Sequence, residues 1–164
     1  MIKQAIELAG QFKRGLAARR RVEGDIFGHG AHDTGETFMG YQIIHWEDLC
    51  TASTGSYDPM AVVQAGRPYI YVNAGLLGLP KDVREGVLAH EVAHIKLEHA
   101  PSTTYLLEAF FGFGEGLELE YAADAFAIEH GYKPQLYLEY MYHKGFKSRA
   151  IKKRLNRITE LNAV

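Results

Sequence analysis

Residues 83–99 read VREGVLAHEVAHIKLEH and contain the pattern H-E-x-x-H at His90, Glu91 and His94. An apolar stripe with a spacing of three and four residues runs through the segment and predicts an amphipathic helix that packs on one side. The stripe consists of Val83, Val87, Leu88, Val92 and Ile95. Residues four apart lie on one face of a helix, so the imidazoles of His90 and His94 can reach the same ion.

The residue between the two histidines suggests what such an ion would do. Glu91 lies about 100° around the helix from His90, beside the metal, where a base for a bound water is needed. H-E-x-x-H on a helix is the zinc-metalloprotease signature. The plain alternative is a helix with two solvated histidines, but the apolar stripe and the small Ala89 and Ala93 beside the histidines favour a packed metal helix.

A third zinc ligand must come from downstream, where the candidates are His99, Glu98, Glu115, Glu118, Glu120 and Asp124. If the helix continues, His99 lies about 140° from His94 and about 180° from His90, off the metal face. Glu98 shares that face but sits two turns from His90, too far to close one tetrahedral site easily.

The remaining candidates lie on a second predicted helix, at residues 117–130. Glu120 and Asp124 are four apart, so both can face the first helix, one as a ligand and one as an acceptor for a ligand imidazole N–H. Glu118 would point about 200° away from Glu120. We therefore predict a site for one Zn²⁺ ion held by His90, His94 and Glu120, with Gly131 as the C-cap of the second helix.

Three runs of the chain, in order, resemble gluzincin peptidases of the HtpX and CAAX-prenyl endopeptidase type. They are residues 69–77 (YIYVNAGLL), residues 87–95 (VLAHEVAHI) and residues 120–127 (EYAADAFA). The resemblance covers roughly residues 58–130. It implies an α+β, zincin-like fold, with the active-site helix and the glutamate helix packed with a small β-sheet or hairpin. It also implies that Glu120 ligates zinc and that Asp124 supports a ligand histidine.

The chain departs from this family in three places. Ala93 stands where many members have glycine, a change of one small residue for another. The family's later His-Pro…Arg element is represented only by His143 and Arg149, without the proline. Larger members carry transmembrane helices, which this sequence lacks, so it looks more like the soluble, stand-alone minigluzincins.

The rest of the chain is predicted as one metallopeptidase domain over residues 1–164. It comprises a basic helix at residues 2–21, a glycine-dense loop at 24–35, a strand within 38–49 and a hairpin of residues 60–64 and 69–73. Helices at 133–144 and 148–162 follow the zincin core of residues 58–130. The loop carries His29 and His32, which are mobile loop histidines in the plainer interpretation and a second metal site in the other.

Substrate contacts are assigned to two places. The second hairpin strand could hold an extended peptide along a free edge, through Ile70, Tyr71, Val72 and Asn73. A further donor for the oxyanion is expected from the C-terminal helices. The candidates for this donor are Tyr140, Tyr142, His143 and Arg149.

Composition and charge fit an ordinary globular protein, 47% hydrophobic and 23% charged. No transmembrane helix or signal peptide is seen, and the single Cys50 excludes an intrachain disulfide, so we expect a cytoplasmic protein. The basic groups concentrate at residues 1–21 and 144–157, and the acidic groups lie between them. Basic ends could contact nucleic acid, but solvated helices, or helices docked on the acidic middle, are the favoured interpretation.

These features predict a soluble zinc-dependent endopeptidase that hydrolyses peptide bonds by a zinc-bound water, with Glu91 as general base. Two alternatives stay open. The protein could be a regulatory protease specific for one partner protein, or a non-catalytic zinc-containing module that binds nucleic acid or protein. A latent zymogen is a further possibility, with the 24–35 loop or a terminal helix over the cleft.

Overall fold

The computed structural model describes residues 31–46, 61–63, 69–99 and 114–163. In these ranges the strands are β1 (Ala31–Phe38), β2 (Tyr41–Trp46), β3 (Ala61–Val63) and β4 (Tyr69–Val72). The helices are α2 (Ala74–Leu77), α3 (Lys81–Lys96), α5 (Gly114–Glu129), α6 (Pro134–His143) and α7 (Arg149–Leu161). The predicted helix at residues 2–21, as well as His29 and Cys50, lies outside the described residues.

The strands form one four-stranded sheet in the order β1-β2-β4-β3. The predicted hairpin of residues 60–64 and 69–73 is confirmed as the antiparallel pair β3 and β4, whereas β2 and β4 run parallel. The strand predicted within residues 38–49 is β2, and it pairs antiparallel with β1. The β1–β2 turn consists of Met39 and Gly40, with φ of 49° and 84°, as two-residue hairpin turns of type I′ require.

The predicted loop at residues 24–35 is wrong in its last part, because Ala31 to Gly35 belong to β1. This strand reads AHDTGETF, most of its side chains are exposed, and the regular pairing with β2 is interrupted between Asp33 and Thr37. It lies at one edge of the sheet. Backbone pairing holds such a strand in place, so its sequence carries no alternation of apolar and polar residues.

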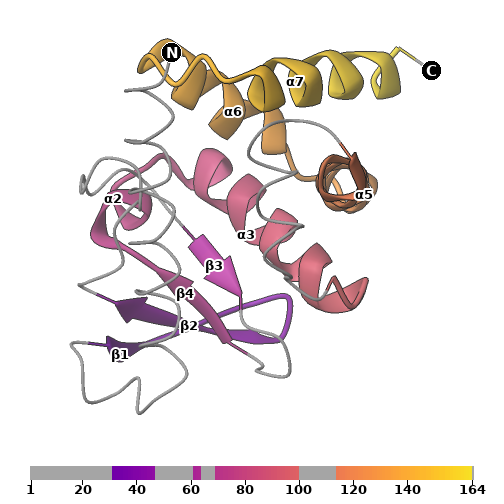
Figure 1. The fold of residues 1–164 in the computed structure, drawn as a ribbon. Coiled ribbons are helices and arrows are strands. Elements are labelled where there is room, and N and C mark those ends of the chain that lie inside the picture. Colours follow the sequence, from indigo (N-terminus) through magenta and orange to yellow (C-terminus); the bar gives the residue numbers. More distant parts are fainter. Residues whose placement is uncertain (1–30, 47–60, 64–68, 100–113, 164) are drawn as a thin grey trace, which may run out of the picture.

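Helix α3 packs on one face of the sheet, and α5 and α6 pack on the other side of α3 (Figure 1). The core between the sheet and α3 is built from buried aliphatic side chains, namely Ile43, Ala61, Ile70, Val72, Leu76, Val87, Leu88 and Val92. Helix α7 lies across α5 and α6. The structure is thus a mixed α+β arrangement in which α3, the H-E-x-x-H helix, is covered on both sides.

A glycine brings α3 and α6 close together. A Cβ atom on Gly86 would lie 2.6 Å from the carbonyl oxygen of Lys133, just before α6 begins. No side chain fits at that distance, so the glycine permits the contact. This contact places the first turn of α6 beside the part of α3 that carries His90.

The helix boundaries agree closely with the predicted ones except at two places: α5 begins at Gly114, three residues before the predicted start, and α3 ends before residue 99. Helices α6 and α7 confirm the predicted helices at 133–144 and 148–162. Gly131 follows α5 with φ of 82°, and the Tyr132 N–H donates to the Ala127 carbonyl, so the predicted glycine cap is confirmed. Helix α3, however, ends at Lys96, and Glu98 adopts a left-handed φ of 54°.

The predicted substrate edge is wrong, because β4 is an interior strand. Ile70, Tyr71 and Val72 pair with β2 on one side and with β3 on the other. Asn73 is buried and caps α2, its side-chain oxygen accepting a bond from the Leu76 N–H. Among the described strands, β3 and β1 hold the two edges of the sheet.

Candidate metal centre

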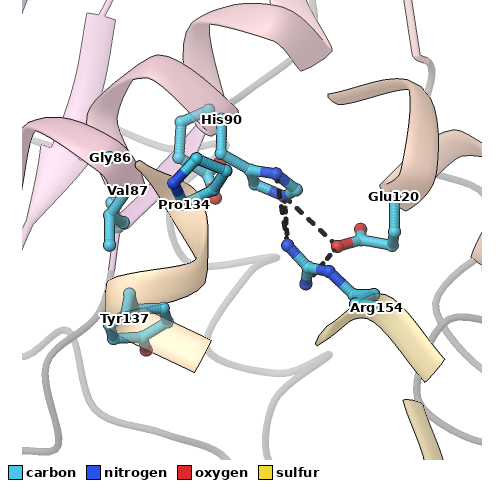
Figure 2. Close-up of a pocket in the computed structure, with 9 residues that line it drawn as sticks. Gly86, Val87, His90, Glu120, Pro134, Tyr137 and Arg154 are labelled. Atoms are coloured by element: carbon cyan, nitrogen blue, oxygen red, sulfur yellow. Dashed lines mark hydrogen bonds and ion pairs between the residues drawn. The ribbon is translucent and has the colours of Figure 1, made fainter. Parts of the chain in front are cut away.

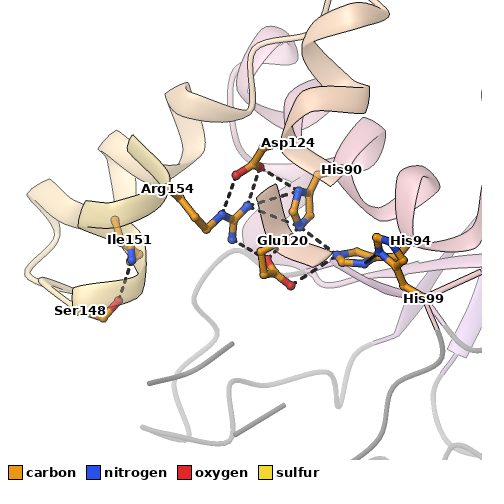
Figure 3. Close-up of polar contacts among 8 residues, drawn as sticks. All are labelled: His90, His94, His99, Glu120, Asp124, Ser148, Ile151 and Arg154. Carbon is orange, nitrogen blue, oxygen red and sulfur yellow. Dashed lines mark hydrogen bonds and ion pairs between the residues drawn. The ribbon is translucent and has the colours of Figure 1, made fainter. Parts of the chain in front are cut away.

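Three side chains from α3 and α5 converge on one point, as Figure 3 shows. His90 Nε2 lies 3.1 Å from His94 Nε2 and 3.2 Å from Glu120 Oε2. His94 Nε2 lies 3.5 Å from Glu120 Oε1. Ligand atoms about 2.0–2.1 Å from a tetrahedral Zn²⁺ ion are roughly 3.3–3.4 Å apart. The two Nε2 atoms, and the carboxylate oxygen of Glu120 that lies nearest to each of them, are therefore separated by distances close to those around a zinc ion.

A buried carboxylate from α5 supports the first histidine. Asp124 Oδ1 lies 2.9 Å from His90 Nδ1, and the Asp124 side chain is almost fully buried. The contact is a hydrogen bond in which Nδ1–H donates, which leaves Nε2 free to face a metal. Asp124 thus lies where it would orient His90.

Arg154 of α7 joins the two carboxylates of α5. Its Nε and Nη2 atoms donate to the two oxygens of Asp124 at 2.8 and 2.7 Å, and its Nη1 lies 2.7 Å from Glu120 Oε2. Nη2 also lies 3.2 Å from His90 Nδ1. A bidentate guanidinium–carboxylate pair fixes both partners in direction, so the basic C-terminal helix docks on the acidic part of the chain at this site.

These contacts govern the protonation of the site before a metal binds. Burial and the charge of Arg154 lower the pKa of His90, but Asp124 and the hydrogen bonds to Asp124 and Glu120 outweigh them and raise it to about 9. Burial and then the charge of His90 lower the pKa of His94 to about 3. Burial alone would raise the pKa of Glu120, yet Arg154 and His90 hold it well below its usual range. Glu120 is therefore a carboxylate, the form that binds a metal.

The second histidine has a different partner. His94 Nδ1 lies 2.9 Å from Nδ1 of His99, and the two rings meet edge to face. The sequence prediction placed His99 off the metal face because it assumed that the helix continues to residue 99. Since α3 ends at Lys96 and the chain turns at Glu98, His99 folds back against His94.

A pocket of about 170 Å³ opens beside His90. Figure 2 shows it between α3, α6 and α7. Glu91 lines it together with His90, Glu120 and Arg154, and its remaining wall is mostly apolar, formed by Ala61, Gly86, Val87, Pro134 and Tyr137. The pocket thus places the Glu91 carboxylate, two members of the cluster (His90 and Glu120) and an apolar surface around one space next to β3.

The four predicted oxyanion donors do not line this pocket. Tyr140 and Tyr142 instead contact the ammonium groups of Lys144 and Lys147, at the far end of α6. His143 and Arg149 are exposed. From the same two helices, Tyr137 and Arg154 line the pocket instead.

A sequence signal for Arg154 existed. Ile151, Leu155 and Ile158 form the apolar stripe of the last helix, and Arg154 lies within this stripe. A charged residue on the packed face of a helix needs a buried partner of opposite charge. Asp124 and Glu120, predicted to face inward from another helix, are such partners.

The second predicted histidine pair is only partly described. His32 lies on β1 with Nε2 3.2 Å from Nδ1 of His45, directly across on β2. His29 lies outside the described residues. Within the described ranges, the one cluster of three or more metal-binding side chains is His90, His94 and Glu120.

Two helices thus present His, His and Glu beside a small sheet, a set of side chains that could hold a metal ion. Comparison with known families points the same way, since residues 51–119 match the model of peptidase family M48. The match includes H-E-x-x-H and ends one residue before Glu120, and it supports a zinc metallopeptidase family. Searches of curated proteins and of solved structures found no match. Within the described residues, no helix is long and apolar enough to cross a membrane.

Proposed function

We propose that the protein is a zinc-dependent endopeptidase in which His90, His94 and Glu120 hold the ion and Glu91 is the general base. The observation that supports the proposal is the convergence of three side chains: the two Nε2 atoms lie 3.1 Å apart, His90 Nε2 lies 3.2 Å from Glu120 Oε2, and His94 Nε2 lies 3.5 Å from Glu120 Oε1. The donor set is also suitable, because two histidines and a carboxylate are typical of catalytic zinc sites. His90, whose pKa is raised to about 9, must lose a proton when the ion binds. The family match supports the metallopeptidase class.

A zinc ion in such a site supplies Lewis acidity, which polarises a peptide carbonyl and makes a water molecule acidic near neutral pH. Glu91 lines the pocket next to His90 and is within the space that the substrate would enter. It accepts the proton of the attacking water and passes it to the leaving amine. Tyr137 and Arg154 line the same pocket and replace the earlier candidates as donors to the oxyanion.

Glu120 needs no proton removed before it can act as a ligand. Arg154 and His90 stabilise its charged form, and Arg154 holds it in direction through Nη1. Asp124 likewise holds the His90 ring in direction, through its contact with Nδ1. Support of this kind around metal ligands typically changes metal affinity or activity by about 10- to 100-fold.

The substrate peptide is assigned to the β3 edge in place of β4. Ala61 of β3 lines the pocket together with Glu91 and His90, so the strand lies beside the reactive space. An extended peptide that adds to a sheet edge gains backbone hydrogen bonds and places alternate side chains in pockets. The apolar wall of Val87, Pro134 and Tyr137 would then receive one apolar side chain of the substrate.

We also propose that the protein is a gluzincin of the HtpX and CAAX-prenyl endopeptidase type. This proposal rests on the sequence resemblance and on the pair Glu120 and Asp124, four residues apart on α5, of which one faces the histidine donors and the other contacts His90 Nδ1. The soluble minigluzincin form stays a prediction from the sequence.

Glu91→Gln tests the mechanism. The variant should bind zinc as the wild type does, because Glu91 is not a ligand, but its hydrolysis of an unfolded protein substrate should fall at least about 10²- to 10⁴-fold, the usual contribution of a general base. Zinc content is measured by elemental analysis and hydrolysis by the release of labelled peptides. The matched control is Glu85→Gln, one and a half turns earlier on α3, which should retain activity. Wild-type rates in Glu91→Gln would exclude the mechanism.

A further inference from the structure

The His94–His99 contact is not used by the mechanism above. Nδ1 of His94 and Nδ1 of His99 are 2.9 Å apart, and the ring centroids are 5.1 Å apart with an interplanar angle of 63°. Distance and geometry are those of a hydrogen bond between two imidazole nitrogens. His94 is buried, and His99 is partly exposed beside it.

The metal fixes the direction of this hydrogen bond. A neutral imidazole carries one proton, so one ring nitrogen donates and the other accepts. If Nε2 of His94 binds an ion, its proton must reside on Nδ1, and His94 then donates to Nδ1 of His99. In the reverse arrangement His99 donates, His94 carries its proton on Nε2, and that nitrogen cannot bind a metal.

The backbone holds His99 in place for this role. After α3 ends, Glu98 turns the chain with a φ of 54°, and the His99 N–H donates to the His94 carbonyl oxygen at 2.9 Å. The two histidines are thus linked twice, once through the backbone and once through the rings. The side chain of His99 is aimed at His94 by the cap of the helix that carries the metal ligands.

We propose that His99 is a positioning residue, which accepts a hydrogen bond from Nδ1 of His94 and so presents Nε2 of His94 to the zinc ion. His99 does not touch the ion or the substrate. The inference rests on the proposed function only as far as the metal site is concerned. In this role His99 orients His94 through Nδ1, as Asp124 orients His90 through Nδ1.

Zinc affinity at fixed pH, measured by competition with a chromophoric chelator on the full chain, tests this role without any assay of hydrolysis. His99→Leu keeps an apolar side chain against His94 but removes the acceptor, and it should weaken zinc binding about 10-fold or more. His99→Asn places an amide oxygen where Nδ1 was, and its affinity should return close to the wild-type value. His130→Leu, which removes an exposed histidine at the end of α5, is the control and should bind as the wild type does.

Wild-type affinity in His99→Leu would overturn the inference, and so would an equal loss in His99→Leu and His99→Asn, because ring packing would then be the cause. Failure of the wild-type chain to bind zinc would overturn the proposed function as well, so the two failures are distinguishable. A second measurement covers the case of a variant that does not fold. Zinc-loaded, ¹⁵N-labelled wild type should show a scalar coupling between the two Nδ1 atoms, with the proton on His94; a proton on His99 would contradict the inference.

Discussion

His90 and His94 lie one turn apart on the same helix, yet they are supported in different ways. Asp124 of α5 accepts a hydrogen bond from His90, and Arg154 of α7 in turn holds Asp124; these charged groups lie 34 and 64 residues after His90 in the chain. His94 is held by His99, a neutral and partly exposed neighbour at the end of its own helix. The first ligand therefore depends on tertiary structure, whereas the second depends on a local turn. Changes around His90 should damage both folding and metal binding, and changes around His94 should affect the metal alone.

Asp124→Ala should have the largest effect. It leaves the Arg154 guanidinium without its bidentate partner and His90 without its acceptor, both in a buried setting. Breaking a buried ion pair from one side costs about 3–5 kcal/mol of the free energy of unfolding. Urea unfolding of the metal-free protein measures it, with Glu160→Ala as the control, since the exposed Arg157–Glu160 pair contributes less than about 1 kcal/mol. If Asp124→Ala lowered the free energy of unfolding no more than Glu160→Ala does, the proposed difference between the support of His90 and that of His94 would be contradicted.

Arg154→Met tests how much the positive charge of Arg154 stabilises the two carboxylates, Glu120 and Asp124. Without zinc, the variant leaves Glu120 and Asp124 as buried carboxylates with His90 as their remaining described cation, and unfolding should become easier by about 3 kcal/mol. A bound zinc ion restores positive charge next to Glu120, so the loss should be smaller in the zinc-loaded protein. Thermal unfolding with and without zinc measures both values. Equal losses in the two states would show that Arg154 acts by packing rather than by charge.

The pH dependence of the metal-free protein should separate the two histidines. The pKa of His90 is raised from 6.5 to about 9 in the folded state, so its stabilisation is complete below pH 6.5 and is lost as the pH rises through about 9. The pKa of His94 is lowered to about 3, so its effect has the opposite sign: it destabilises the folded protein as the pH falls below about 6.5 and adds little slope above that pH. The free energy of unfolding should therefore fall by a few kcal/mol between pH 6.5 and 9.

Urea unfolding at several pH values checks this dependence, and Asp124→Ala should flatten it, because Asp124 is the main source of the raised pKa of His90. Stability that is constant from pH 6.5 to 9 in the wild type would contradict the assigned protonation of His90.

Glu98→Gly should have the smallest effect and the opposite sign. Glu98 has a φ of 54°, which glycine adopts without the steric cost that a Cβ brings. We expect stabilisation by about 0.5–1 kcal/mol, with the His94–His99 contact retained. Gly131→Ala is the matched reverse change, because Gly131 has a φ of 82° after α5, and it should destabilise the protein by a similar amount. Destabilisation by Glu98→Gly in urea unfolding would show that Glu98 makes a needed contact.

The sequence predicted the parts of this molecule that local patterns encode. The α3 helix, the helices that follow it, the glycine cap at Gly131 and the β3–β4 hairpin all have a period, a cap residue or a turn that can be recognised. Glu120 was selected because helix geometry restricts which side chains can face α3. Strand β1 was not predicted, because its polar sequence has no alternation of apolar and polar residues. Its extended conformation is held by pairing with β2.

The parts of the site that the sequence did not predict have two physical causes. Which edge of a hairpin is open depends on the neighbouring strand, and β2 covers β4 although it lies about 25 residues earlier in the chain. Arg154 reaches the site because α7 crosses α5, a packing that no local pattern states, although its place on an apolar stripe was a clue. His99 was misplaced because a single left-handed residue, Glu98, reverses the chain. Long-range packing and one unusual dihedral angle determine these features, and the periodicity of the sequence does not report either of them.

The central claim is that His90, His94 and Glu120 form one zinc site. Anomalous diffraction at the zinc edge, on crystals of the zinc-loaded wild type, tests it most directly. We expect one zinc ion with bonds of about 2.0–2.2 Å to Nε2 of His90, Nε2 of His94 and a carboxylate oxygen of Glu120. A protein without zinc, or a zinc ion bound at other side chains, would contradict the account.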